Sequence, residues 1–190
     1  YLFTIFSYYS SIINYKKLTP INKIMKDTIL RYSLTLIITL LSNIFYTIFA
    51  PLTIYPVYAI LSLTQTTLLT NNVIAFNGTE FTFIPACIAG TAYLVLTVLI
   101  LTTKGIKAIT RVKALLTSYL LLLTANIIRI LLLIFIYHKF GEQVFDTIHL
   151  LFWHILSTII VLAIWILLTK IYKIKHIPVY DDIKHLIKNL

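Results

Sequence analysis

Long apolar runs separated by short basic blocks make up most of the chain. Three of the runs cover residues 86–103, 114–137 and 148–169, which are 18, 24 and 22 residues long. A helix needs roughly 20 predominantly apolar residues to cross the hydrocarbon core of a bilayer. We therefore predict that each of these runs is one membrane-spanning helix.

The basic blocks between the runs predict the direction of each helix. Fourteen of the sixteen Lys and Arg residues lie within residues 16–31, 104–113 and 170–188. An excess of positive charge marks the loops that stay in the cytoplasm. With all three blocks cytoplasmic, residues 86–103 run inward, and the segment that precedes them lies outside the cell.

The region before residue 86 contains a stretch of 48 residues without any charged side chain, so its length alone permits one span or two. Because the blocks on either side are both cytoplasmic, the number of crossings before residue 86 must be odd. We predict one, over residues 29–51. Residues 52–85 then form an external segment. We expect its first part, residues 52–70, to be a helix along the outer membrane surface, since Pro56 and several Thr positions suit an interface better than hydrocarbon.

The two ends of the chain complete this arrangement. The chain opens at Tyr1 without a methionine, so we expect an N-terminal portion to be missing and residues 1–14 to be the end of an earlier span. Residues 170–190 are expected to form a cytoplasmic tail. The whole chain, residues 1–190, is then a single transmembrane domain of a multi-pass protein in the cell membrane.

The sequence "NNVIAFNGTEFTFIP" predicts a β-hairpin within the external segment. Strand-forming runs at residues 73–76 and 81–84 flank Asn77-Gly78, the strongest short hairpin signal. Asn77 also begins a tripeptide that matches a glycosylation acceptor, but we interpret it as a turn. Pro85 ends the second strand and starts a helix at about residue 86.

Composition agrees with a membrane protein and excludes other classes. Hydrophobic residues make up 59% of the chain, charged residues only 12%, and the mean hydropathy is +0.94, whereas a soluble domain carries about 25% charged residues. The net charge of +10 does not predict nucleic-acid binding, because no basic stripe is interleaved with aromatic residues. We predict an all-α integral membrane protein, a helical transmembrane bundle with a small external β-hairpin.

The only cysteine of the chain, Cys87, lies where the hairpin meets the next span. One cysteine excludes an internal disulfide or a cysteine-based zinc cluster. A cysteine in an apolar helix is often inert packing. In the first turn of a helix, however, free backbone N–H groups and the positive end of the helix dipole favour the reactive thiolate. Cys87 is thus a candidate nucleophile at the outer face.

Arg129 is a charge inside the apolar run 114–137, about 12 Å below its outer end at 1.5 Å per residue. A guanidinium at such depth costs at least about 2.5–3.5 kcal/mol on insertion, so it must face the bundle interior and find a partner. Asn126 lies one turn away on the same face and can support it. The alternative is a structural ion pair with Glu142 or Asp146.

Three histidines lie near the outer ends of the last two spans. His149 and His154 are five residues apart, so their rings point about 140° apart on a helix and do not act as one pair. A metal or haem site would need ligands from several helices, and His138 without a carboxylate pattern does not supply them. In cysteine hydrolases a thiol is the nucleophile and an adjacent histidine is its general base. Depth alone does not choose between His149 and His154.

These residues make the sequence resemble the exosortase/archaeosortase family of membrane protein-sorting cysteine transpeptidases. The resemblance runs from about Val73 to Leu168. It rests on the hairpin that leads into "PACIAG", on "NIIR" in the next span, and on "IHLLFWH" at the start of the last one.

The resemblance implies an active site on the outer face formed by Cys87, Arg129 and His149, with Asn126 and His154 in supporting positions. It also implies substrates: secreted proteins that end in a short motif, an apolar helix and a basic tail. Cleavage would transfer the new C-terminus to an acceptor such as a lipid of the bilayer, without a cofactor or a metal ion. The rival interpretation is a non-enzymatic transporter or assembly subunit that binds an anionic lipid or solute through Arg129.

Overall fold

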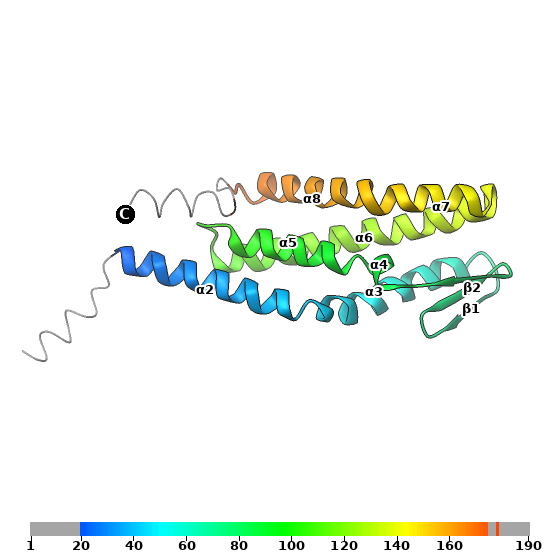
Figure 1. The fold of residues 1–190 in the computed structure, drawn as a ribbon, viewed down its shortest axis with the longest axis horizontal. Helices are drawn as coiled ribbons and strands as arrows, with labels where there is room; N and C mark the ends of the chain where they lie inside the picture. The colour runs from blue at the N-terminus through cyan, green and yellow to red at the C-terminus, as the bar shows by residue number, and fades with distance from the viewer. Residues whose placement is uncertain (1–19, 175–177, 179–190) are drawn as a thin grey trace, which may run out of the picture.

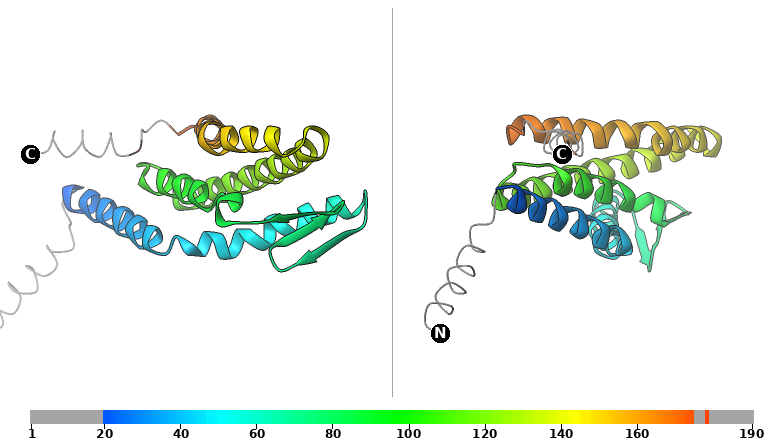
Figure 2. Two further views of the ribbon diagram at one scale, coloured as in Figure 1. Left: turned by 45° about the vertical axis from the view of Figure 1, so that its right-hand side comes forward. Right: turned by 60° about the vertical axis from the view of Figure 1, so that its left-hand side comes forward.

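The computed structural model describes residues 20–174 and residue 178. They form an elongated helical bundle with a three-stranded sheet at one end (Figure 1). The helices lie in three layers: α7 and α8 on one side, α5 and α6 in the middle, and α2 and α3 on the other side (Figure 2). In chain order the elements are α2 (Pro20–Leu40), α3 (Asn43–Ser62), β1 (Thr67–Thr70), β2 (Val73–Phe76), β3 (Thr79–Thr82), α4 (Pro85–Ile88), α5 (Gly90–Thr102), α6 (Ala108–Phe140), α7 (Glu142–Leu151), the π-helix η1 (Phe152–Leu156) and α8 (Ser157–Ile171).

The predicted helix over residues 29–51 is present as parts of two helices. α2 ends at Leu40 and α3 begins at Asn43, and the two follow one another along the length of the bundle (Figure 1). α3 then continues past residue 51 to Ser62. A separate surface helix over residues 52–70 is therefore wrong: its first part belongs to α3, and its last four residues form strand β1.

The sheet confirms the turn at Asn77-Gly78. β2 and β3 pair antiparallel with Phe76 opposite Thr79, and both turn residues have positive φ, 51° and 79°, as a two-residue hairpin of type I′ requires. The second strand is Thr79–Thr82, two residues earlier than predicted, because such a turn places Thr79 directly after Gly78 in the ladder. β1 adds a third antiparallel strand that the sequence reading missed.

The predicted span over residues 86–103 begins as expected but is broken near its start. Pro85 is the first residue of α4, where its missing N–H is not needed. After one turn Ala89 takes a left-handed conformation with φ 57° and ψ 33°, and α5 begins at Gly90. The thiol-bearing turn α4 is thus separated from the long helix that follows it.

α6 and the helix that follows form an antiparallel pair. α6 has 33 residues, about 50 Å at 1.5 Å per residue. Gly141, with φ 83°, allows the chain to reverse, and α7, η1 and α8 then continue as one helical rod (Figure 1). The predicted spans over residues 114–137 and 148–169 both lie within these helices.

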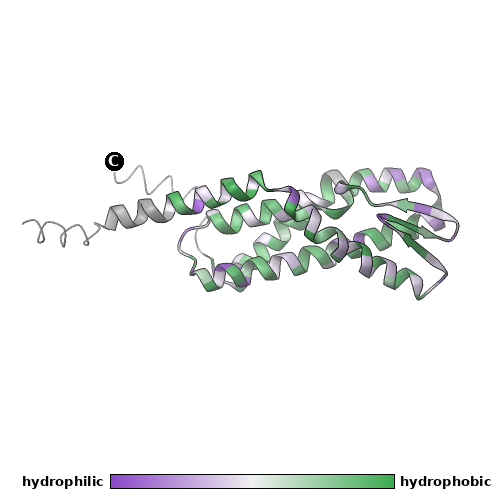
Figure 3. Ribbon diagram, turned by 90° about the horizontal axis from the view of Figure 1, so that it is seen from below, coloured by the Kyte–Doolittle hydropathy of each residue, from purple (hydrophilic) through white to green (hydrophobic). Residues whose placement is uncertain are grey.

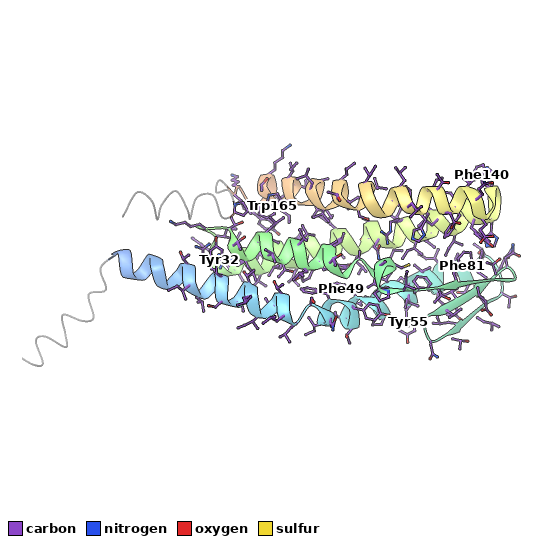
Figure 4. The ribbon with its side chains drawn as sticks, viewed as in Figure 1. Tyr32, Phe49, Tyr55, Phe81, Phe140 and Trp165 are labelled. Carbon is purple, nitrogen blue, oxygen red and sulfur yellow. The ribbon has the colours of Figure 1, made fainter. Side chains whose placement is uncertain are left out.

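Stacked aromatic rings hold the middle of the bundle together. The rings of Phe49 and Tyr93 are parallel with centroids 3.6 Å apart, and both pack edge-on against Tyr119. The hydroxyl of Tyr119 hydrogen-bonds with Thr97 at 2.6 Å. Phe49 lies between α3 and α5 in Figure 4. These contacts bind α3, α5 and α6 to one another just beyond the broken segment at Ala89.

One end of the bundle gathers basic residues. Arg31, which is 3% exposed, donates a hydrogen bond to the carbonyl of Thr102 at 2.7 Å. Arg111 donates to the carbonyl of Thr103 at 3.1 Å. These bonds satisfy carbonyls that the end of α5 leaves without a helical partner. The bond from Arg31 also shows that the start of the predicted span, at residue 29, lies beside the end of α5.

Hydrophobic residues make up much of every helix of the bundle (Figure 3), and many of their large apolar side chains are exposed. Within the described residues, α3 and α6 are each long and apolar enough to cross a membrane, judged by length and composition. Residues 28–40, α5 and α8 are apolar as well but shorter.

Candidate active site

Cys87 lies in the single turn of α4, beneath the end of the sheet. Its backbone N–H donates to the carbonyl of Ile84 at 2.9 Å, and its side chain is half-buried against the hydrophobic core. The structure therefore agrees with the predicted position in the first turn of a helix. It adds that this helix ends at Ile88, the next residue.

The early end of α4 leaves the backbone carbonyl of Cys87 without a partner in its own helix. Two side chains of α6 supply hydrogen bonds instead. Nδ2 of Asn126 and Nη2 of Arg129 each donate to this carbonyl oxygen at a distance of 3.0 Å. The predicted pairing of Asn126 and Arg129 on one face is thus present, and both residues hold the peptide unit that carries the thiol.

Arg129 is the centre of the candidate site. It is 8% exposed, and its Nη1 donates to the hydroxyl of Ser157 at 3.2 Å. No ion pair joins Arg129 to Glu142 or Asp146 among the described residues, so neutral groups hold the guanidinium. A guanidinium has five N–H donors. Two of them are engaged here, and Nε is buried without a hydrogen-bond partner in the described part of the chain.

His149 approaches the same place from α7. Its side chain is half-buried, and it lies near enough to Arg129 and to Asp146 for both charges to act on it. Arg129 in turn lies within electrostatic range of Cys87. The structure therefore brings Arg129 into contact with the Cys87 backbone and places His149 within electrostatic range of Arg129.

A chain of ring contacts fixes His149 from the side of the sheet. Phe81 of β3 packs edge-on against Tyr137 with centroids 5.3 Å apart, Tyr137 packs against Phe145 at 5.5 Å, and Phe145 lies 5.4 Å from the imidazole of His149. We call these four residues the aromatic chain. It connects the sheet to the site through α6 and α7.

The other histidines have different surroundings. The backbone of His154 belongs to η1, while its side chain lies outside the described part of the structure. His138 packs edge-on against Phe76 and Phe81 of the sheet, with centroids 5.2 and 5.9 Å apart. Within the described residues no three His, Cys, Asp or Glu side chains gather in a way that could hold a metal ion.

A small cavity adjoins the guanidinium between α5, α6 and α8. Its volume is about 20 Å³, which is room for about one water molecule. Arg129, Asn126 and Ser157 form its polar wall, and alanines of α5 and α6 form much of the rest. Cys87 and His149 lie outside this wall, so the cavity is a space behind the candidate site.

Ser157 is the residue of this site that sequence reasoning missed. It contacts Arg129, and its hydroxyl donates to the carbonyl of Phe152 at 2.8 Å. The available signal was a serine within the apolar run 148–169, at a position that needs a polar partner in hydrocarbon.

Together these groups supply a thiol, an imidazole and N–H donors. Cys87 offers a nucleophile, His149 a proton acceptor, and Arg129 unused N–H donors within a closely packed interior. Comparison of the chain with models of known protein families, with curated proteins and with solved structures finds no match. The case for any function therefore depends on the residues themselves.

Proposed function

We propose that this chain is a membrane-embedded cysteine peptidase or transpeptidase of the exosortase/archaeosortase type. The observation that carries the proposal is the convergence of Cys87, Arg129 and His149 from three separate helices. Residues 42 and 20 positions from Arg129 in sequence have no local reason to meet it. A thiol, a guanidinium with free donors and an imidazole are the groups that acyl transfer needs.

Each residue has a defined role in the proposed reaction. His149 accepts the thiol proton as the sulfur of Cys87 attacks the scissile carbonyl. The unused N–H groups of Arg129 donate to the oxyanion that forms. Collapse of the tetrahedral intermediate releases the amine with the proton from His149 and leaves a thioester on Cys87. Water, or an amine or hydroxyl of a lipid, then attacks the thioester and regenerates the thiol.

The proposal includes a multi-pass arrangement in the cell membrane with the active site outside. Support comes from the two ends of the bundle. Arg31 and the loop that contains Lys104 and Lys107 lie at one end, and the sheet, Glu142 and α7 lie at the other (Figure 1). A basic end is expected in the cytoplasm. Cys87 then lies toward the outside, because a whole helix, α5, separates it from the basic loop.

The proposed substrates are secreted proteins that end in a motif, an apolar helix and a basic tail. The apolar outer faces of the helices would offer lateral contact to such a tail helix within the bilayer (Figure 3). The basic tail would remain on the cytoplasmic side, and this places the motif that precedes the apolar helix at the outer surface, at the level proposed for Cys87.

Cys87→Ala tests the proposed function. Membranes that contain the wild type or the variant at matched expression are supplied with a co-expressed secreted protein of this kind, and tail removal is followed by immunoblot. We expect the variant to insert and fold but to leave the tail in place. In the wild type, mass spectrometry is expected to find a peptide attached to Cys87 that hydroxylamine releases. Full tail removal by the variant would rule out this function.

The rival function, binding of an anionic lipid or solute at Arg129, has less support. The space beside the guanidinium is about 20 Å³, enough for about one water molecule. A phosphate or carboxylate ligand would have to separate α6 from α5 and α8 to reach Arg129 there.

A further inference from the structure

The helical rod from α7 to α8 contains one turn with an extra residue. The backbone N–H of Ser157 donates to the carbonyl of Phe152, five residues earlier, where an α-helix would use the fourth. This turn, η1, is therefore a π-turn, and such turns occur frequently at functional sites.

The extra residue changes which side chains share a face of the rod. His149 and Ser157 are eight residues apart, and an uninterrupted α-helix would leave them about 80° apart. One residue is absorbed by the π-turn, so the two are related as residues seven apart, which is roughly two full turns. Without the π-turn, Leu150 would share the face of Ser157.

Contacts on both sides of the turn agree with this rotation. Ser157 accepts a hydrogen bond from Arg129, so its face points at α6. His149 is half-buried and lies within range of the Arg129 charge, whereas Leu150 is 57% exposed. The π-turn thus places the half-buried His149, and not the exposed Leu150, on the face of the rod that Ser157 presents to α6.

Ser157 also determines how the guanidinium is held. Its hydroxyl donates to the carbonyl of Phe152, which leaves the oxygen lone pairs directed at Arg129. The same residue therefore closes the π-turn and accepts from Nη1. The orientation of Arg129 and the rotation of His149 depend on one local structure.

We infer that the π-turn is a positioning element: it selects His149 in place of Leu150 for the candidate site, and Ser157 is a positioning residue for Arg129. This inference deepens the proposed function and rests on it for its catalytic meaning. Its geometry can be tested without a substrate, because Arg129 connects the π-turn, through Ser157, to the backbone of Cys87.

The experiment measures the alkylation of Cys87 by iodoacetamide in detergent-solubilised protein. Since the chain has one cysteine, the mass of the intact protein reports this thiol alone. The ratio of the rates at pH 7 and pH 9 cancels differences in access and reports how strongly the site favours the thiolate. An imidazole that accepts the proton of the thiol makes more thiolate available at pH 7 and so raises this ratio. We expect His149→Ala to lower it about tenfold. His138→Ala should lower it less than about twofold, because this ring reaches the imidazole only through Phe81 and Tyr137 of the aromatic chain.

Three variants of the rod test the π-turn itself. Exchange of the two side chains, His149→Leu with Leu150→His, should lower the ratio as much as His149→Ala does. Deletion of the exposed Ile155 should keep the ratio within about twofold of the wild type, because His149 is then seven residues before Ser157 in an ordinary α-helix. Insertion of one alanine after Ile155 should lower the ratio about tenfold, since it rotates the imidazole away.

Ser157 is tested by a matched pair. Ser157→Ala removes the acceptor for Arg129 and should lower the ratio about threefold, and Ser157→Thr, which retains the hydroxyl, should restore it. Circular dichroism and gel filtration verify that each variant is folded. The inference would be overturned if the exchanged variant had the same ratio of alkylation rates as the wild type. It would also be overturned if deletion of Ile155 lowered this ratio as much as His149→Ala does.

The alkylation experiment and the tail-removal experiment can fail independently of each other. If Cys87→Ala still removes the tail while the alkylation pattern is as expected, the function is wrong and the positioning geometry is right. If Cys87→Ala abolishes tail removal while the exchanged variant alkylates like the wild type, the function stands and the inference is wrong.

Discussion

Two buried arginines hold the two ends of the segment from α4 to α5. Arg31 donates to the carbonyl of Thr102 where the segment ends, and Arg129 donates to the carbonyl of Cys87 near its start. The bond is chemically the same, but the surroundings differ. Arg31 lies at the basic end of the bundle, whereas Arg129 lies inside an apolar helix, within electrostatic range of the Cys87 thiol and of His149. The contact alone therefore does not distinguish the two arginines, and the role proposed for Arg129 depends on its neighbours.

The strongest test of this difference is the same conservative change at both positions. Arg129→Lys keeps the charge but loses the planar fork of donors, so we expect tail removal to slow at least about 100-fold, the usual effect of losing an oxyanion donor. Arg31→Lys should slow it less than about threefold, because only a helix end is affected. The rates are measured in membranes with matched expression.

Thermal unfolding of the two variants in detergent provides the control. Similar melting temperatures with different rates would support a catalytic role for Arg129 alone. Equal losses of activity in both variants would mean that Arg129, like Arg31, only supports the segment.

The opposite ends of the bundle should also differ in their exposure to reagents. In a Cys87→Ala background, a single cysteine at Glu142 should react with an impermeant maleimide in intact cells, whereas one at Lys107 should react only after permeabilisation. We expect labelling to differ at least about tenfold, because the basic loop is cytoplasmic. Labelling of position 107 in intact cells would invert the proposed topology and place the thiol on the wrong side of the membrane.

The smallest expected effect concerns Ala89, the residue at which the helix is broken between α4 and α5. Ala89 has φ 57°, a conformation that glycine adopts without steric cost. Ala89→Gly should therefore stabilise the protein by about 0.5–1 kcal/mol, whereas Ala86→Gly, three residues earlier within α4, should destabilise it by a similar amount. Unfolding midpoints in detergent measure both. A loss of stability in Ala89→Gly would mean that the left-handed residue is absent in the membrane protein.

Features with strong local signals were predictable from the sequence. Asn77-Gly78 favours one turn type, so the hairpin was found to within two residues. Asn126 and Arg129 are spaced by one helical turn, so their shared face followed from periodicity. The apolar runs predicted the helices α6 and α8 because their length leaves few alternatives.

Features that depend on tertiary contacts were not predictable in the same way. An alanine at position 89 gives no sign of a left-handed residue, and the break there is supported by side chains of α6. Strand β1 has a weak sequence signal and forms because β2 lies beside it. The π-turn leaves no recognisable pattern either, since its extra residue is an ordinary member of an apolar run.

The aromatic chain from Phe81 to His149 has a consequence for how this sequence can change over generations. Each ring is a contact of the next, so a smaller side chain at Phe81 would loosen Tyr137, then Phe145, and finally the imidazole. Amino-acid substitutions in the surface hairpin at Phe81 are therefore restrained by the need to hold His149 on α7. In descendants of this protein, substitutions at positions 81, 137 and 145 should be inherited together, so that the sheet and the site diverge as one unit.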